Sequence, residues 1–402
     1  MNEYLELEKL YYKKINVENE YLNRINNPCT FKTTLYINPI NKKGEKEKDI
    51  KFELFYLPIA DILKLQDNIM ANSKAITELA SKLPNIAQKS CIKEIMLNEI
   101  VKSNQVEGVY TTKKEVYDSI TSKKLDRLTG ITKKYIQIVD NKIEKITKIE
   151  EFREMYDDIF SDDILLDPNN KLDGKIFRKS QVHINDGLRN IHTGDASEEL
   201  IIEHLNDLIK FMNNDSINFL IKASITHYYF EYIHPFYDGN GRTGRLLCSM
   251  YLTRKLDIFT GLSLSFAIFN EKNKYSKLFK NTSDIKNFGE VTFFIKGFLE
   301  LIVKGQESIL EMLKNKKEKL SYAFTMLENL SLKKIEKDIL FIYLQNYIFS
   351  KTSPLKDKEM SEIIELSRPT LDKLLKKLET MDYISKISSK PSIHTIGNKI
   401  KI

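Results

Sequence analysis

Hydrophobic residues recur along most of the chain at intervals of three and four positions, which places them on one face of an α-helix. This spacing predicts helices over residues 61–83, 86–103, 111–120, 135–146 and 197–213. Residues 216–233 are hydrophobic on nearly every side, as in a helix at the centre of a bundle. A buried helix over 291–302 is expected to close the core, and a Lys/Glu-rich helix over 303–330 to connect it to the tail. The pattern predicts a mainly α-helical fold.

Alternation of polar and hydrophobic residues, which is typical of strands, is confined to short segments. Residues 30–40 and 50–57 alternate and predict a small hairpin near the N-terminus, joined by the charged segment 42–49. We interpret this hairpin as a clasp on the core without chemistry of its own. A second short strand is predicted over 178–184, inside a stretch that contains several Gly and Pro residues.

The last seventy residues have an organisation of their own. Two helical segments, a turn at residues 367–369, a further helix and a basic hairpin follow one another, the order of elements in a winged helix-turn-helix. The segment 353–402 contains ten Lys or Arg and seven Asp or Glu residues, a net charge of only +3. Since DNA binding usually requires a clearer basic face, DNA and protein both stay open as partners of this region.

Composition narrows the class of protein only slightly. The net charge of +7 over 402 residues is mildly basic and indicates no particular partner. Cys29, Cys91 and Cys248 are far apart and fit neither a metal site nor a disulfide framework, which favours a reducing cytoplasm. The N-terminus is acidic and amphipathic rather than a signal peptide, and no apolar run approaches the roughly 20 residues of a membrane helix. We expect a cytoplasmic protein with no membrane partner.

The segment 233–246, I-H-P-F-Y-D-G-N-G-R-T-G-R-L, concentrates the chemistry of the chain. It is expected to be a loop that leads into a helix, where the backbone N–H groups of Gly239 and Gly241 can bind anions. Arg242 and Arg245 would share a helix face and bind a polyphosphate. Asp238, together with phosphate oxygens, could hold Mg²⁺. His234 is the candidate base, so the segment indicates transfer of a phosphate-containing group to a hydroxyl.

This segment resembles the signature of the Fic family, H-P-F-x-[DE]-G-N-G-R-x-x-R, at every defined position. The resemblance implies a helical core that transfers AMP from ATP to a Ser, Thr or Tyr hydroxyl of a protein. It implies that His234 is the base, that Phe236 anchors the loop and that Asp238 holds Mg²⁺. The phosphates would be bound by five residues of the loop and helix: Gly239, Asn240, Gly241, Arg242 and Arg245. Because family members that act as kinases have Lys in place of Gly241, this glycine favours nucleotidyl transfer.

A second segment gains meaning from this resemblance. By itself, Ser103–Gly108 predicts only a helix end capped by glycine. It also matches the inhibitory motif of the family, [ST]-x-x-x-E-[GN], on a helix expected over about 86–107. Glu107 could pair bidentately with Arg245 and displace the γ-phosphate, with Ser103 helping to orient the pair. We therefore expect an enzyme that is autoinhibited in cis.

Two further sites follow from the resemblance. A β-hairpin flap would bind the target segment by main-chain pairing, with Val182 and Ile184 on the contact strand. Tyr275 would lie against adenine or ribose, although it fits a core tyrosine equally well. His227 and Glu231 are interpreted as a hydrogen-bonded pair that supports the site, since no third metal ligand is evident.

The predicted domains are an N-terminal region with the inhibitory helix (1–122), a Fic core (123–302), a connector (303–332) and a winged-helix domain (333–402). The leading hypothesis is a protein adenylyltransferase that uses Mg-ATP, with a protein hydroxyl as substrate and the chain itself among the candidate targets. The alternative is a DNA-binding regulator in which the Fic core senses a nucleotide. Transfer of a phosphate or of another nucleotide is a third hypothesis. The sequence does not decide the oligomeric state, and a homodimer is one option.

Overall fold

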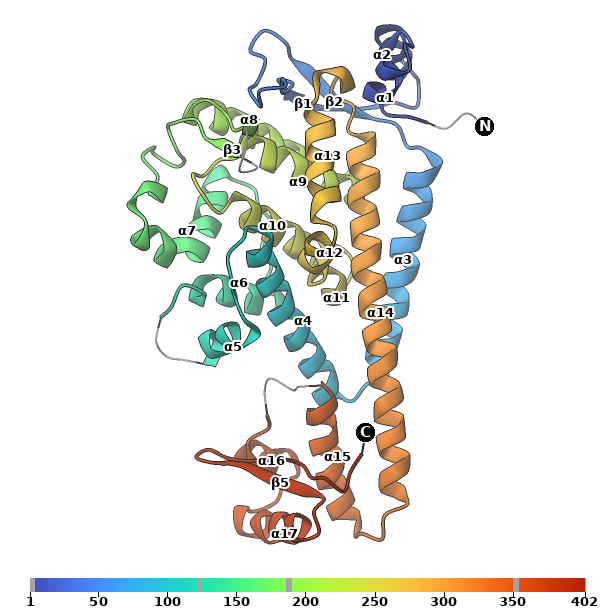
Figure 1. Ribbon diagram of the computed structural model, residues 1–402, viewed down its shortest axis with the longest axis vertical. Helices are drawn as coiled ribbons and strands as arrows, with labels where there is room; N and C mark the ends of the chain where they lie inside the picture. Colours follow the sequence, from blue (N-terminus) through green and yellow to red (C-terminus); the bar gives the residue numbers. More distant parts are fainter. Residues whose placement is uncertain (1–3, 122–124, 186–189, 350–353, 402) are drawn as a thin grey trace. The chain divides into compact units, whose positions relative to one another are not determined.

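The computed structural model describes residues 4–121, 125–185, 190–349 and 354–401 of the chain (Figure 1). The chain divides into two compact units. Unit 1 comprises Met1–Ser73 and Glu99–Gln306, and unit 2 comprises Lys74–Asn98 and Glu307–Ile402. Helices account for most of the described residues, and the three sheets each have two strands, so the expectation of a mainly α-helical fold is confirmed.

Three long helices contribute to both units: α3 (Ala60–Ser81), α4 (Asn85–Val106) and α14 (Thr292–Glu328). The other elements of unit 1 are α1 (Leu7–Tyr12), α2 (Val17–Ile25), β1 (Phe31–Ile37), β2 (Phe52–Tyr56), α5 (Lys113–Thr121), α6 (Thr129–Val139), α7 (Ile149–Leu166), η1 (Pro168–Asn170), β3 (His183–Asn185), β4 (Asn190–Thr193), α8 (Glu198–Met212), α9 (Phe219–Ile233), α10 (Asn240–Lys255), α11 (Ile258–Gly261), α12 (Leu264–Asn270), α13 (Lys272–Ser283) and η2 (Ile285–Asn287). Unit 2 adds α15 (Lys334–Phe349), α16 (Asp357–Ile363), α17 (Arg368–Thr380), β5 (Ile384–Ser389) and β6 (Ser392–Ile396).

Helix α9 is the centre of unit 1. From Leu220 to Ile233 every residue except Glu231 is buried, as the nearly continuous hydrophobic pattern indicated. Asn218 caps its N-terminus by accepting a hydrogen bond from the Leu220 N–H. Helices α8 and α10 both pack against it, and α10 follows it in the chain after only six residues. A short loop fixed between two buried helices is a rigid place for reactive groups.

The predicted N-terminal hairpin is present as β1 and β2, an antiparallel pair in which Phe31 faces Tyr56 and Ile37 faces Phe52. Thr33, Leu35 and Ile37 alternate toward the interior. The 14 residues between Ile37 and Phe52 form a long loop, whose contacts are described below.

Three local predictions were wrong. The helix predicted over 135–146 ends at Val139, because Asn141 takes a left-handed conformation (φ 56°) and Lys142 N–H bonds back to the Gln137 carbonyl. The helices predicted separately over 291–302 and 303–330 form one continuous helix, α14. The strand predicted over 178–184 is only the three-residue β3, since Arg178 faces the interior.

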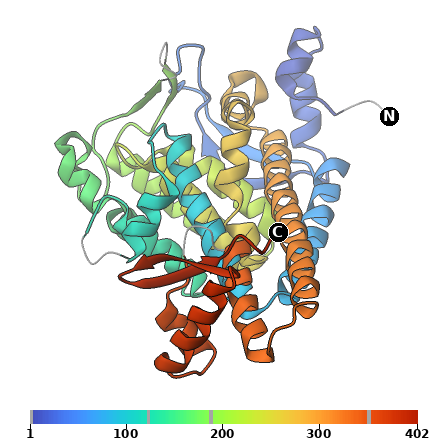
Figure 2. The ribbon, with the colours of Figure 1, turned by 60° about the horizontal axis from the view of Figure 1, so that its bottom comes forward.

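Unit 2 contains α15, α16, α17 and the hairpin β5–β6, drawn in orange to red in Figure 2. Its polar centre is the buried carboxylate of Asp357. That carboxylate accepts hydrogen bonds from Ser392 Oγ (2.6 Å), His394 Nδ1 (2.9 Å) and Tyr343 OH (3.2 Å), and Arg368 Nη2 lies 3.2 Å away. One side chain thus joins three helices to the hairpin. The assignment of this region as a winged helix stays a prediction, as do the predicted domain boundaries.

Two further expectations concern single features. The three cysteines are free thiols, with Cys29 exposed and the other two buried. Over the described ranges, no helix has both the length and the apolar character required to cross a bilayer.

Candidate functional site

The loop between α9 and α10 is closed by its own side chains. Asn240 Oδ1 accepts a hydrogen bond from the Phe236 N–H (2.9 Å), and Asn240 Nδ2 donates to the Phe236 carbonyl (2.8 Å). The Phe236 ring is fully buried and stacks on Tyr156 with centroids 3.8 Å apart. Phe236 therefore has the anchoring position expected. The side chain of Asn240 was expected to hold a phosphate, but in this structure it fixes the turn.

Helix α10 begins at the end of this turn. Gly239 is its N-cap with φ 78°, and a Cβ there would lie 2.6 Å from the Phe160 ring, so the turn requires glycine. The N–H groups at the start of α10 and the positive end of the helix dipole form an anion-binding cradle. A Cβ on Gly241 would lie 2.2 Å from Glu107 Oε1. The carboxylate of Glu107 therefore lies directly against this cradle.

Arg245 binds both residues that were predicted at the end of α4. Its Nη1 lies 2.7 Å from Glu107 Oε1. Its Nε donates to Ser103 Oγ (3.1 Å) and its Nη2 to the Ser103 carbonyl (2.8 Å). The pairing with Glu107 is thus through one nitrogen and not bidentate as expected, because the other two nitrogens of Arg245 donate to Ser103. Burial alone would raise the pKa of Glu107, but Arg245 outweighs burial and lowers it, so the carboxylate is anionic at neutral pH.

His234 lies at the C-terminal end of α9 in a left-handed conformation (φ 55°). Its Nδ1 is 3.2 Å from the Glu231 carbonyl oxygen. A carbonyl only accepts hydrogen bonds, so Nδ1 carries the proton and Nε2 retains a free lone pair. Burial lowers the pKa of His234 to about 4, so the imidazole is neutral at pH 7. The arrangement suits a general base.

Asp238 and Arg242 lie on the solvent side of the loop. The Asp238 side chain is 57% exposed, and its Oδ2 lies 3.4 Å from Arg242 Nη2. The Arg242 guanidinium also covers the Phe160 ring at 4.3 Å. Both residues line a cavity of about 210 Å³, to which Arg127 and Asn104 also contribute. Two guanidinium groups, a carboxylate and an amide give this cavity the chemistry of a phosphate or metal–phosphate site.

Asp238 would have to hold a metal ion with little help from the protein. Within the described parts of the chain, no group of three or more His, Cys, Asp and Glu side chains could hold a metal ion. An exposed carboxylate beside a polyphosphate site fits Mg²⁺, which takes one or two carboxylates and fills its other positions with phosphate oxygens and water. The residues present are therefore compatible with Mg²⁺ brought by a nucleotide.

The expected pair of His227 and Glu231 does not form. His227 Nε2 instead lies 2.6 Å from Tyr275 OH, with both residues buried. The engaged hydroxyl favours the alternative that Tyr275 is a core tyrosine. Glu231 Oε1 is buried without a hydrogen-bond partner, and Oε2 lies 3.8 Å from His234 Nδ1. Burial, with a contribution from Glu107, raises the pKa of Glu231 to about 8 against the opposing charge of Arg245.

A hairpin corresponding to the predicted flap lies next to His234. In it β3 pairs with β4 in antiparallel register, with Ile184 opposite His192, and Gly194 N–H extends the ladder to the Val182 carbonyl (3.0 Å). Within the described residues the sheet has no third strand, so the outer edge of β3 is unpaired. Val182 and Ile184 are both half-buried. Their place on this edge is compatible with the predicted target-binding strand.

Arg178 was not identified from the sequence as a site residue. Its side chain is fully buried and donates to the carbonyls of His234 (Nε, 2.8 Å), Asp195 (Nη1, 2.7 Å) and Ser180 (Nη1, 2.7 Å). The guanidinium therefore connects the flap to the backbone of His234. An arginine in an alternating segment gives no sequence signal for this role, because all of its acceptors are backbone carbonyls.

The fold and the loop define a helical protein with a phosphate-binding turn, a neutral histidine and a carboxylate pressed against the turn. Residues 145–252 match the Fic/DOC family. Protein adenylyltransferase fic-1 of Caenorhabditis elegans is 40% identical over 62 residues, which are 15% of this chain and 12% of that protein. Protein adenylyltransferase Fic of Drosophila yakuba is 29% identical over 119 residues, 29% of this chain and 22% of that protein.

Among solved structures, a Fic family protein from Desulfovibrio desulfuricans G20 aligns with a TM-score of 0.54 at 17% identity. The alignment covers 86% of this chain and 99% of that protein. This similarity concerns the fold. The chain spans less than a quarter of the length of the two curated relatives above. It contains a Fic/DOC domain, as its signature segment led us to expect.

Proposed function

We propose that the chain is a protein adenylyltransferase, which transfers AMP from ATP to a Ser, Thr or Tyr hydroxyl of a protein and releases pyrophosphate. The observation that carries this proposal is the arrangement of His234. Its Nδ1 proton is engaged by a carbonyl, its pKa is low and its Nε2 is free, beside an anion-binding helix start. A group that only sensed a nucleotide would not need a neutral base at this place.

Each residue would have a defined part in the reaction. Nε2 of His234 takes the proton of the attacking hydroxyl, whose oxygen forms a bond to the α-phosphorus while the bond to the pyrophosphate oxygen breaks. The N–H groups of Gly239, Asn240 and Gly241 hold phosphate oxygens, and Arg242 and Arg245 bind the β- and γ-phosphates. Asp238 would hold Mg²⁺, which neutralises phosphate charge. Tyr275 would contact the adenine or the ribose.

We further propose that Glu107 inhibits the enzyme. The Glu107 carboxylate lies 2.7 Å from Arg245 Nη1 and against the backbone of Gly241. It therefore occupies the position that an anionic phosphate would take. Ser103 holds the guanidinium in that position through two hydrogen bonds. ATP would therefore bind only weakly or with its phosphates misplaced until the carboxylate is removed.

The test is incubation of lysate proteins with α-labelled ATP and the Glu107→Gly variant. Label on protein that disappears in the Glu107→Gly/His234→Ala double variant supports the proposal. Label from γ-labelled ATP would indicate phosphotransfer, and stronger label from UTP another nucleotide. A salt-sensitive gel shift with DNA and no labelling at all would favour a DNA-binding regulator instead. Mass spectrometry of the labelled proteins identifies the target and shows whether the chain modifies itself.

A further inference from the structure

The loop between β1 and β2, residues 38–51, is folded on itself. Asn38 Nδ2 donates to the carbonyls of Glu47 (3.0 Å) and Ile50 (2.8 Å), so the start of the loop is fixed to its end. The Asn38 N–H also donates to Tyr232 OH (2.8 Å), at the end of α9. The loop of the hairpin that was interpreted as a clasp without chemistry therefore contacts Tyr232, which lies two positions before His234 in the chain.

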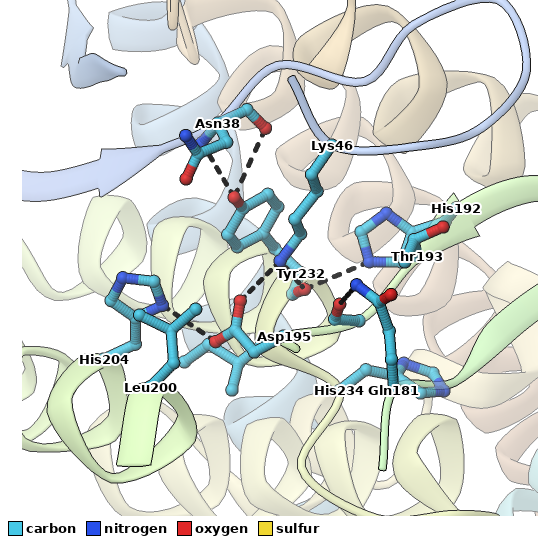
Figure 3. A network of polar contacts seen from close by, with 12 residues as sticks. Asn38, Lys46, Gln181, His192, Thr193, Asp195, Leu200, His204, Tyr232 and His234 are labelled. Atoms are coloured by element: carbon cyan, nitrogen blue, oxygen red, sulfur yellow. Dashed lines mark hydrogen bonds and ion pairs between the residues drawn. The ribbon is translucent and has the colours of Figure 1, made fainter. Parts of the chain in front are cut away.

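Lys46 extends from this loop into the protein (Figure 3). Its Nζ lies 2.5 Å from Asp195 Oδ1, donates to the Tyr232 carbonyl (3.3 Å) and lies 3.6 Å from the centre of the Tyr232 ring. The second oxygen of Asp195 lies 2.8 Å from His204 Nδ1. Asp195 directly follows the flap, and its N–H donates to the Ile233 carbonyl (3.0 Å). Lys46 therefore joins the loop, the base of the flap and the end of α9.

A second contact between the loop and the flap is independent of charge. The Gly44 carbonyl accepts hydrogen bonds from Thr193 Oγ1 (2.6 Å) and Asn190 Nδ2 (3.0 Å), which belong to β4. Gly44 has φ 78°, and a Cβ there would lie 2.4 Å from the Asn190 carbonyl oxygen. The loop thus covers β4, while no strand among the described residues pairs with the outer edge of β3.

The ammonium of Lys46 is buried and therefore requires a counter-charge and hydrogen-bond acceptors around it. Its side chain is 9% exposed and that of Asp195 is fully buried. Burial lowers the pKa of Lys46 and outweighs the carboxylate of Asp195, which raises it, and the guanidinium of Arg178 lowers it further. His192 and His234 face the same region, and burial keeps the pKa of each imidazole low. A buried ion pair with several hydrogen bonds contributes little net stability but fixes geometry, the use best attested for such pairs.

We propose that the loop 38–51 is a support for the flap and that Lys46 is a positioning residue for the protein substrate. By holding β4 against the end of α9, the loop leaves the edge of β3 as the place where an extended target segment pairs, next to His234. The inference rests on the proposed function, since a flap needs a support of this kind only if a polypeptide binds to it. ATP binding should not depend on this loop, because neither Lys46 nor Gly44 contacts the phosphate-binding turn.

The experiment compares full-length variants that all carry Glu107→Gly. Lys46→Met removes the ammonium, and Lys42→Met is the matched control, an exposed lysine of the same loop. Gly44→Ala forces β4 to shift while the ion pair stays, so it tests the support even if Lys46→Met folds poorly. Three quantities are measured: the Kd of Mg-ATP, labelling of lysate proteins at increasing lysate concentration, and hydrogen exchange of the amides of residues 190–195.

For Lys46→Met and Gly44→Ala we expect faster exchange in residues 190–195 and about a tenfold higher lysate concentration for half-maximal labelling. The maximal rate and the Kd of Mg-ATP should stay within about twofold, as in Lys42→Met. Unchanged exchange, or an unchanged half-maximal concentration with faster exchange, would overturn the inference. An absence of His234-dependent label in the parent variant would instead refute the proposed function, so the two failures are distinguishable.

Discussion

Two ion pairs flank His234, and they differ in how far their charged groups are buried. In the pair of Lys46 and Asp195 the carboxylate is fully buried, and His204 binds its second oxygen. In the pair of Glu107 and Arg245 the guanidinium is equally buried, but the carboxylate is 36% exposed and reaches it from the end of α4. An ion pair with one solvent-facing partner can exchange that partner for another anion, whereas an enclosed pair cannot. Burial of one charge alone therefore does not make an ion pair permanent.

The largest expected effect is on stability, at the pair of Lys46 and Asp195. Asp195→Asn leaves the ammonium of Lys46 buried without a counter-charge, which should lower the free energy of unfolding by about 3 kcal/mol. Urea unfolding followed by circular dichroism measures this change. Asp207→Asn, which disrupts the exposed pair with Lys210 on α8, is the control and should cost less than about 1 kcal/mol. Equal losses in the two variants would show that enclosure is not what distinguishes the pairs.

The second prediction concerns the pair of Glu107 and Arg245, where a mutation should change the activity rather than the stability. Glu107→Gly should raise His234-dependent labelling about 100-fold, because Arg245 and the N–H groups near Gly241 become available to phosphate. Glu107→Gln separates charge from volume, since it keeps the side-chain size without the carboxylate. A rise with Gly and none with Gln would mean that the block is steric. If neither variant raises the labelling, Glu107 does not inhibit the enzyme.

The third prediction concerns pH. Because burial lowers the pKa of His234 to about 4, the neutral base is present throughout the neutral range. Glu107 raises this pKa by its charge, so Glu107→Gly moves it further down. Labelling by Glu107→Gly should therefore stay within about twofold from pH 8 to about pH 5.5, although a free histidine would lose its base form near 6.5. Initial rates across this range test it, and a midpoint near 6.5 would contradict the assignment.

The smallest expected effect is at Glu231, which lies near Arg245 but whose Oε1 has no hydrogen-bond partner. Its folded pKa of about 8 lies above the unfolded value of 4.5, so its contribution to stability decreases as pH rises between these values. Glu231→Gln does not titrate. Its stability relative to the native protein should therefore be greater at about pH 7.5 than at about pH 6.5, by on the order of 1 kcal/mol. Thermal unfolding at the two pH values measures the difference, and an equal or opposite difference would contradict it.

The sequence was sufficient to predict the helical fold and the residues of the loop at 233–246, because helical periodicity and a contiguous motif are both local signals. It was also sufficient to select Ser103 and Glu107 as candidates. It could not reveal that Ser103 binds Arg245 or that Asn240 closes the turn, since both depend on side-chain geometry. Lys46 and Asp195 are 149 positions apart, and neither stands in a motif. Such distant pairs are evident only once the chain is folded.

The absent side chain at Gly241 has a consequence for how this protein could change. The same open space admits the phosphates in the proposed reaction and the carboxylate of Glu107 in this structure, where a methyl group would lie 2.2 Å from the carboxylate oxygen. A mutation to alanine would expel the resident anion, but it would crowd the nucleotide as well. Under the proposed inhibition, a variant at this position that excluded Glu107 would also impair nucleotide binding, so variants that escape the inhibition should instead change the end of α4, which directly precedes Glu107.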